Sequence, residues 1–332
     1  MKKILTGFLA ATALTLSSIT AFAEGEPAVQ FDLGGKFDKS FNEAAFNGAE
    51  KWKAESGKAY LEFEIQNADQ REQGLRKFAE AGANPVVAIG FSNADAITKL
   101  ADEFPKTNFV IVDMVVDKPN VRSVVFKEEE GSYLVGILAA MASKTGKGGF
   151  VGGMDIPLIS KFGCGYVGGF KSVKADGEVF MNMTGDTPAA WNDPVKGGEL
   201  AKSQFDRGAD VVYAAAGQTG LGVLQAAKDA GKLSIGVDSN QNGIQPGSVL
   251  TSMLKRVDTA VYNAFTEAQA GKFTAGINVL GLKEGGVDYA LDDNNKALVT
   301  DEMKAAVDKA KADIIAGTVK VHDFMTDNKC PY

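Results

Sequence analysis

The sequence is poor in the residues that most catalytic and metal sites use. It has one histidine and two cysteines in 332 residues. His322 lies in a polar stretch near the C-terminus, where a solvated surface position is the simplest interpretation. This leaves almost no material for a Ser-His-Asp triad or a histidine-based metal site. Gly-x-Ser-x-Gly, the phosphate-binding Gly-x4-Gly-Lys-Ser/Thr and the dinucleotide Gly-x-Gly-x-x-Gly motif are missing from their proper contexts. We therefore expect no metal, no organic cofactor and no enzyme of these classes.

The sequence also lacks an excess of positive charge. Its 35 Lys and Arg residues face 42 Asp and Glu residues, which gives a formal net charge of −7. Binding to nucleic acid needs basic patches that displace counterions, and anionic lipid attracts the same patches. We therefore expect neither of these partners. The abundant glycine and apolar residues instead suit a packed α/β protein.

The N-terminal segment has the features of a signal peptide. Lys2 and Lys3 precede an uncharged, mostly apolar run, and Ala21-Phe22-Ala23 has the small-x-small pattern of a cleavage site. The apolar run is shorter than the ~20 residues that a membrane span needs. We expect residues 1–23 to be removed, leaving a soluble periplasmic protein that begins at Glu24. No cysteine lies near the cut, so we expect no lipid anchor.

Two cysteines remain in the exported chain, Cys164 and Cys330. An even number of cysteines in an oxidising compartment is consistent with a disulfide. Two unpaired thiols are the alternative, and the residues alone do not decide between them.

Strand-like and helix-like segments alternate along the mature chain. Short apolar runs such as residues 85–89 and 109–112 are typical of strands buried on both faces of a parallel sheet. The alternation runs to residue 126 and restarts with a helix expected over residues 131–143. Two successive βα series predict an α/β fold with two doubly wound, Rossmann-like lobes.

The elements after residue 237 are expected to complete both sheets. No low-complexity linker separates the two series, which fits a chain that crosses between the lobes through short segments. We assign residues 24–125 and 256–288 to lobe 1. We assign residues 126–255 and 289–332 to lobe 2.

Polar and aromatic residues follow the carboxyl ends of several predicted strands. In open α/β sheets this edge is where ligands bind. Asp32, Asp113 and Asp238 occupy such positions. Any one of them is equally explained as a helix N-cap, but three at separate strand ends favour a shared site. The same edges carry two aromatic residues, an amide and a cation: Phe41, Trp191, Asn42 and Lys255.

Two of the candidates have a second interpretation. The run from Gly217 to Gly222 follows a strand and opens a helix, so its amides can face a ligand, although a plain tight turn explains it equally well. Trp191 lies between a strand and the helix near Pro194. It is expected to project into the cleft, and the alternative is that it packs beneath that helix.

Several motifs together resemble the basic membrane protein family of ABC transporter substrate-binding proteins. The opening segment Phe31-Asp-Leu-Gly-Gly-Lys-Phe-Asp-Lys-Ser-Phe-Asn42 carries the strongest likeness. The resemblance covers nearly the whole mature chain. Its other motifs lie at residues 151–159, 216–222, 235–241 and 249–255.

The resemblance implies a type I periplasmic-binding-protein fold with three crossings between the lobes. It also implies delivery of a purine nucleoside to an ABC permease in the inner membrane. Relatives often carry a lipid-attachment cysteine that this sequence lacks, and a Phe is more usual where Trp191 stands. The family's ligand positions match Asp32, Phe41, Asn42, Asp113, Asp238 and Lys255.

These features predict a monomeric binding protein that closes around a purine nucleoside or base. Phe41 and Trp191 are expected to stack on the two faces of the base. Asp113 and Asp238 are expected to accept hydrogen bonds from the ribose hydroxyls, with Lys255 offsetting their repulsion. The polar edge of the base is assigned to the remaining candidates, Asp32 and Asn42.

Three other functions share some of these features. A sugar-binding protein of the same fold also uses aspartates and aromatic rings, and a ligand-sensing partner of a membrane receptor has the same architecture. A nucleoside hydrolase is the enzymatic alternative, but it needs a calcium-binding aspartate cluster near the N-terminus. The sequence around Asp32 does not supply one, and Asp292-Asp293 is better explained as a polar turn.

Overall fold

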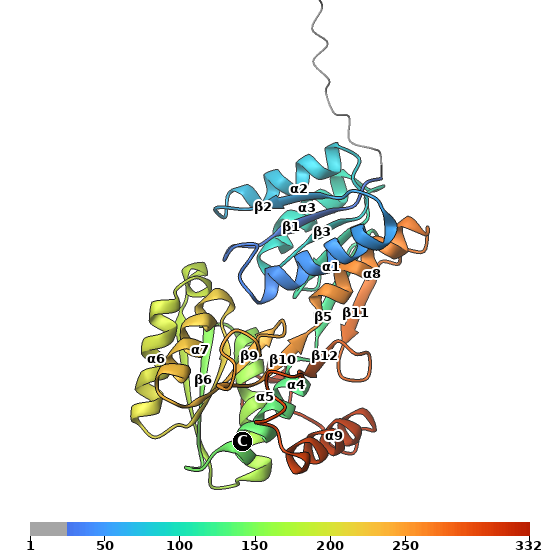
Figure 1. Cartoon of the computed structure of the whole chain (residues 1–332). Helices are drawn as coiled ribbons and strands as arrows, with labels where there is room; N and C mark the ends of the chain where they lie inside the picture. Colours follow the sequence, from blue (N-terminus) through green and yellow to red (C-terminus); the bar gives the residue numbers. More distant parts are fainter. Residues whose placement is uncertain (1–24) are drawn as a thin grey trace, which may run out of the picture.

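The computed structural model describes residues 25–332, so the expected signal peptide and Glu24 lie outside the described residues. The chain forms two α/β lobes, each built on a six-stranded sheet (Figure 1). The two sheets use strands from different parts of the chain. This is the two-lobed arrangement that the alternating sequence pattern predicts.

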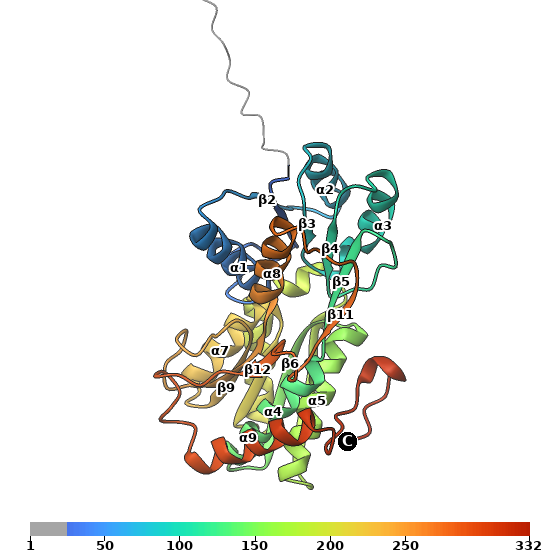
Figure 2. The same cartoon turned by 90° about the vertical axis from the view of Figure 1, so that its right-hand side faces the viewer.

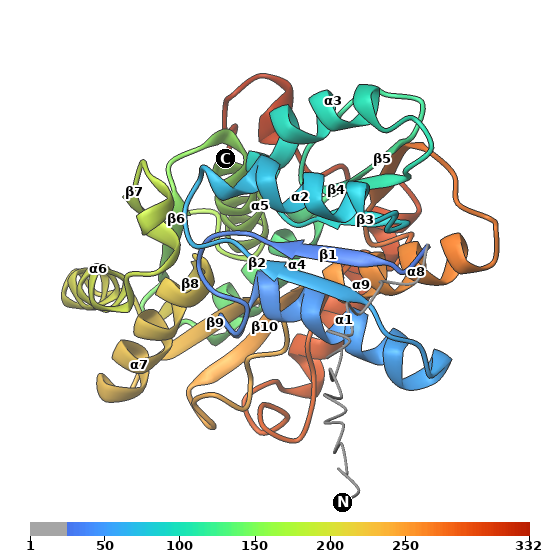
Figure 3. The same cartoon turned by 90° about the horizontal axis from the view of Figure 1, so that it is seen from above.

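The sheet of the first lobe has the strand order β11-β5-β4-β3-β1-β2, and all its pairs are parallel. Helices α1 and α8 pack together on one face, and α2 and α3 pack together on the other (Figure 3). The elements of this lobe are β1 (Ala28–Phe31), α1 (Phe41–Ser56), β2 (Leu61–Glu64), α2 (Gln70–Glu80), β3 (Val86–Ala88), η1 (Phe91–Asn93), α3 (Ala94–Glu103), β4 (Phe109–Val112), β5 (Val121–Phe126), α8 (Val257–Gln269) and β11 (Gly276–Leu280).

The sheet of the second lobe has the order β12-β10-β9-β8-β6-β7, in which only the edge strand β12 is antiparallel. Its elements are α4 (Glu128–Ala142), β6 (Lys147–Met154), α5 (Pro157–Val173), β7 (Glu178–Gly185), η2 (Pro188–Trp191), α6 (Pro194–Asp206), β8 (Val211–Ala215), η3 (Gly217–Thr219), α7 (Gly220–Asp229), β9 (Leu233–Asp238), β10 (Val249–Lys255), β12 (Val287–Tyr289), α9 (Asp301–Ile315) and η4 (Phe324–Thr326).

The chain passes between the lobes three times. It crosses from β5 to α4, from β10 to α8, and from β11 to β12. The assigned lobe boundary at residue 288 falls inside β12, which pairs with β10 in the second sheet. The sheet pairing therefore places the third crossing between Leu280 and Val287.

The central strands are buried on both faces, as their apolar composition predicts. Strands β1, β3, β4 and β8 have no exposed residue. Close packing of α4 on α5 completes the core of the second lobe. Helix α4 begins at Glu128, three residues before the expected start at Gly131. The misplaced boundary arose because three consecutive glutamates do not show apolar periodicity, although acidic residues are favourable in the first turn of a helix.

The C-terminal tail folds back along the second lobe after α9 (Figure 2). Cys330 in this tail and Cys164 in α5 form a disulfide, with their Cα atoms 5.5 Å apart. Within residues 25–332, no helix has the length and apolar character of a membrane span.

Candidate functional site

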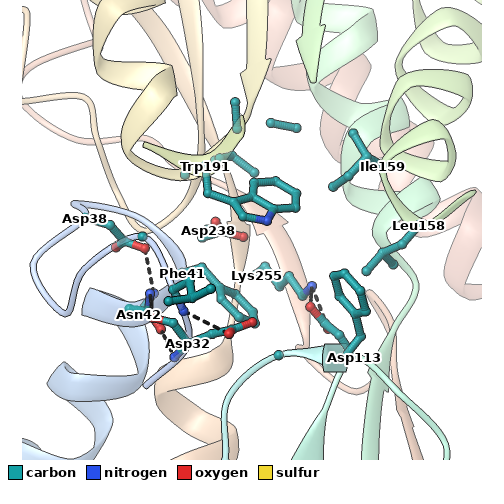
Figure 4. Close-up of a pocket in the computed structure, with 18 of the residues that line it drawn as sticks. Asp32, Asp38, Phe41, Asn42, Asp113, Leu158, Ile159, Trp191, Asp238 and Lys255 are labelled. Atoms are coloured by element: carbon teal, nitrogen blue, oxygen red, sulfur yellow. Dashed lines mark hydrogen bonds and ion pairs between the residues drawn. The ribbon is translucent and has the colours of Figure 1, made fainter. Parts of the chain in front are cut away.

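The main pocket lies between the two lobes, where the carboxyl ends of strands from both sheets meet. Its empty space is about 640 Å³, counting the mouth that opens to solvent. All eight candidates from the sequence line it: Asp32, Phe41, Asn42, Asp113, Trp191, Gly217, Asp238 and Lys255. All of them except Gly217 are labelled in Figure 4.

Lys255 is the central cation of the pocket. It ends β10 at the second crossing, and its side chain is 2% exposed. Its Nζ lies 2.7 Å from Asp113 Oδ1 and 2.9 Å from Glu128 Oε1. A buried ammonium is tolerated only when such partners compensate for lost hydration. Burial alone would lower the pKa of Lys255, but the carboxylates of Asp113 and Glu128 outweigh it and raise that pKa.

Asp113 and Asp238 occupy corresponding positions in the two lobes. Asp113 directly follows β4, and Asp238 is the last residue of β9. Both adopt the left-handed region that few non-glycine residues enter, with φ of 71° and 62°. Strained conformations of this kind cluster at functional sites. They turn both carboxylates toward the space between the lobes (Figure 4).

Burial raises the pKa of both of these aspartates to about 6. Lys255 acts in the opposite direction on each, and so does the Ser40 hydroxyl that donates a hydrogen bond to Asp238. The two carboxylates are therefore charged acceptors at neutral pH and lose that charge in mild acid.

Asp32 is held by groups of its own lobe. Its Oδ1 accepts a hydrogen bond of 2.8 Å from the Leu33 amide and lies 3.0 Å from Arg71 Nη2. Burial is the largest influence on the pKa of Asp32 and raises it, against the lowering effect of Arg71. The carboxylate thus lies at the pocket wall, and its Oδ1 is already engaged by Leu33 and Arg71.

Asn42 supports the pocket loop through its amide. Its Oδ1 accepts from the Asp32 backbone N–H at 3.0 Å, and its Nδ2 donates to the carbonyls of Asp32 and Gly35. The side chain is buried, and these bonds occupy both of its donors. The structure therefore gives Asn42 a role in holding the loop, and its contact with the polar edge of a ligand stays a prediction.

An aromatic ring enters the pocket from each lobe. Phe41 is the first residue of α1 in lobe 1, and Trp191 ends the short helix η2 in lobe 2 (Figure 4). Gly217, with φ of 57°, lines the wall beside Trp191. Phe41 also lies 5.2 Å from Lys255 Nζ, measured to the ring centroid. A flat ligand between the two rings would therefore also lie next to the charged groups.

The chain matches, over residues 27–323, the family model described as ABC transporter substrate-binding protein PnrA-like. The chain belongs to this family. Such proteins bind solutes for ABC transporters and are not enzymes. The resemblance seen in the sequence motifs is thereby confirmed, as is the type I periplasmic-binding fold.

Individual relatives agree with this membership. The chain is 38% identical over 317 residues to the ABC transporter nucleoside-binding protein BmpA of Lactococcus lactis subsp. cremoris, covering 89% of this chain and 88% of that protein. It is 31% identical over 313 residues to Basic membrane protein A2 of Borrelia garinii subsp. bavariensis, covering 91% and 90%. A relative in Pyrococcus furiosus, 35% identical over 79% of this chain and 69% of its own length, is named an uncharacterized lipoprotein. The crystal structure of an ABC transporter solute-binding protein from Aeropyrum pernix K1 aligns with a TM-score of 0.81 at 29% identity, over 90% of this chain and 93% of the other.

Sequence reasoning missed three charged residues of this substrate-binding protein's site. Glu128 is buried against both Lys255 and Lys161. Asp38 lines the pocket and accepts hydrogen bonds from the backbone of Ser40 and other residues at the start of α1. Arg71 holds Asp32 from α2. Only Asp38 carried a local signal, since an aspartate just before a predicted helix is typical of a cap.

Proposed function

We propose that this protein captures a purine nucleoside between its two lobes and passes it to an ABC permease. The observation that carries the proposal is the pairing of groups across the pocket. Both lobes contribute aromatic rings and strand-end carboxylates, among them Phe41 and Asp113 from lobe 1 and Trp191 and Asp238 from lobe 2, and Lys255 lies at the crossing between the lobes. A nucleoside offers a flat base for the rings and a pair of ribose hydroxyls for the carboxylates.

The energies of these contacts suit reversible capture. Stacking on an aromatic side chain contributes about 1–3 kcal/mol per base. Hydrogen bonds to charged acceptors contribute about 1.5–3 kcal/mol each. A few such contacts support micromolar binding, about −8.2 kcal/mol, after the cost of ordering the ligand and closing the lobes.

The charge of the pocket favours an uncharged ligand. The ammonium of Lys255 is already shared by two carboxylates, and the Arg71 guanidinium is paired with Asp32. Among the described residues that line the pocket, Lys255 is the one cation, so a phosphate group would meet these carboxylates without an unpaired cation to receive it. We therefore propose a nucleoside rather than a nucleotide. The name of the Lactococcus relative, a nucleoside-binding protein, supports the same class.

The decisive experiment is mass spectrometry of the ligand that co-purifies with the native protein. It is followed by titration calorimetry of the ligand-free protein with inosine, guanosine, adenosine, inosine 5′-monophosphate and ribose. We expect at least one nucleoside to bind with micromolar affinity or better, and the monophosphate and ribose to bind far more weakly. Ribose binding as tight as nucleoside binding would favour the sugar-binding alternative and overturn the proposal.

Trp191→Ala tests the stacking contact directly. Loss of the ring is expected to weaken nucleoside binding by ~1–3 kcal/mol. Ligand addition is expected to change the fluorescence of Trp191, while Trp52, buried beside Phe265 in the first lobe, should respond little. Unchanged affinity in Trp191→Ala would contradict stacking, whatever its effect on stability.

We further propose that the mature protein is a soluble periplasmic monomer beginning at Glu24. The features of residues 1–23 support cleavage, and both cysteines of the chain are joined in the second lobe. Some relatives are named lipoproteins, so the anchor needs a direct test. Intact-mass analysis after export should give the unmodified chain from residue 24. An added acyl mass, or retention of residues 1–23, would contradict this.

A further inference from the structure

Trp191 can lie in its position in the pocket because a neighbouring residue, Gly153, has no side chain. The sequence did not predict this glycine as a site residue. Gly153 is the next-to-last residue of β6, a strand between β8 and β7 in the second sheet. A Cβ atom built on Gly153 would lie 3.0 Å from Cη2 of Trp191, and closer still to Cζ3 and Cε3. All three are atoms of the six-membered ring of the indole. An alanine at 153 and the present indole therefore cannot occupy this space together.

The backbone that carries Trp191 is tied down, so it does not easily move the ring away. The Thr184 hydroxyl lies 3.0 Å from the Gly153 carbonyl and 3.0 Å from the Ala190 carbonyl. The Thr219 hydroxyl donates to the same Ala190 carbonyl at 2.8 Å and accepts from the Asp193 amide at 2.7 Å. These bonds fix the turn immediately before and after Trp191. A methyl group at 153 would therefore change the side-chain torsion angles of Trp191.

The Cβ atom of Trp191, which carries the indole, is also confined on the side opposite Gly153. A Cβ on Gly34, in lobe 1, would lie 3.5 Å from Trp191 Cβ, and one on Gly217 would lie 3.8 Å from it. The indole is therefore held between β6, η3 and the loop of the first lobe. Its displacement from Gly153 would carry it toward the ligand space or out of the pocket mouth.

We propose that Gly153 is a positioning residue for ligand binding, and that Gly153 and Trp191 form a matched pair. The six-membered ring of the indole occupies the space that a side chain at 153 would fill. This contact sets the distance between the rings of Trp191 and Phe41. A phenylalanine at 191 has no atoms where the outer edge of the indole lies, so it does not need this glycine. This inference rests on the proposed nucleoside binding for its ligand readout, whereas the packing of the pair stands independently of it.

The test is a double-mutant cycle on wild type, Gly153→Ala, Trp191→Phe and the double variant, with inosine as the probe in calorimetry. We expect Gly153→Ala to weaken inosine binding about tenfold or more when residue 191 is Trp, the loss of roughly one stacking contact. In the Trp191→Phe background the same change is expected to cost less than about threefold, because the two groups no longer collide. Gly185→Ala is the matched control. It lies at the end of the neighbouring strand β7, and its added methyl would meet only Ala190 Cβ at 3.7 Å.

A second readout needs no ligand. The difference between the emission spectra of wild type and Trp191→Phe isolates Trp191 from the buried Trp52. We expect Gly153→Ala, but not Gly185→Ala, to shift the emission of Trp191 and to increase its quenching by acrylamide. If Gly153→Ala fails to fold, recovery of the thermal transition in the double variant supports the pair, and its absence contradicts it.

Equal losses of affinity in both backgrounds, or an unchanged Trp191 emission in Gly153→Ala, would overturn the proposal. If wild type does not bind inosine or the other nucleosides, the proposed function fails. In that case the emission spectra and the thermal transitions still decide whether Gly153 positions Trp191.

Discussion

At the scale of single residues, the pocket depends on one buried cation and the carboxylates around it. Lys255→Met removes the partner of Asp113 and leaves its carboxylate buried without compensation, while Glu128 keeps Lys161 as its second partner. Breaking a buried ion pair in this way typically costs about 3–5 kcal/mol. We expect Lys255→Met to lower the free energy of unfolding by that amount in urea titrations. Adding Asp113→Asn should recover part of the loss because it removes the charge that Lys255→Met leaves unpaired. No recovery would show that Asp113 does not depend on Lys255.

Asp238 gives the residue-scale prediction on pH. Its pKa of about 6 means that it accepts hydrogen bonds as a charged group at pH 7.5 and largely loses its charge at pH 5. Nucleoside affinity should therefore fall as the pH drops through about 6, and Asp238→Asn should bind weakly, with an affinity that depends less on pH.

The free energy of unfolding should change with pH in the opposite sense. A raised folded-state pKa means that the folded protein disfavours the ionised form, so the contribution of Asp238 to stability declines as the pH rises from about 4 to about 6. Calorimetry and urea titrations across this range, compared with Asp238→Asn, measure both trends, and an identical pH profile in that variant would contradict the assignment.

At the scale of elements, helices α4 and α5 approach each other through glycines. A Cβ on Gly169 of α5 would overlap the backbone carbonyl of Tyr133 in α4. Because that carbonyl belongs to a helix, relief requires the two helices to separate, and overpacking of this kind costs about 1–3 kcal/mol. We expect Gly169→Ala to lower the melting temperature measured by circular dichroism. Gly168→Ala is the control with the same change in helix propensity, since the three atoms nearest to its Cβ all belong to the exposed ring of Tyr332, which can move without separating α4 from α5. Equal effects of the two changes would contradict an effect of helix separation.

At the scale of the whole molecule, the lobes are joined by direct hydrogen bonds beside the pocket as well as by the three crossings. Ser239 Oγ of lobe 2 donates to the Ser40 carbonyl of lobe 1 at 2.9 Å, and Gln241 Nε2 donates to the Lys39 carbonyl at 2.9 Å. Such bonds exist only when the lobes are together, so they favour closure by about 0.5–1.5 kcal/mol each. Ser239→Ala should therefore increase the radius of gyration of the ligand-free protein in X-ray scattering, and saturating ligand should restore it. Ser172→Ala is the control because its hydroxyl bonds within α5. Identical scattering of the two variants would show that the bond does not bias closure.

The sequence by itself determined the α/β class, the two lobes and the edge of the sheets where the pocket lies. These follow from local properties: apolar runs mark buried strands, and parallel strands bring Asp113 and Asp238 to the carboxyl edges that flank the cleft. The resemblance of its motifs to those of known proteins identified the family. Periodicity did not find the first turn of α4, where Glu128 and Glu129 are buried beside Lys255 and Lys161 from distant segments.

Only the tertiary structure decided how the candidate side chains are used. The amide of Asn42 forms hydrogen bonds within its own loop, and Asp32 is held by an arginine from α2. Gly153 has no side chain, and its contact with the indole of Trp191 appears only in the folded chain. The physical reason is that hydrogen-bond partners and excluded volume depend on residues far apart in the chain. Periodicity and composition record only what a residue's near neighbours require.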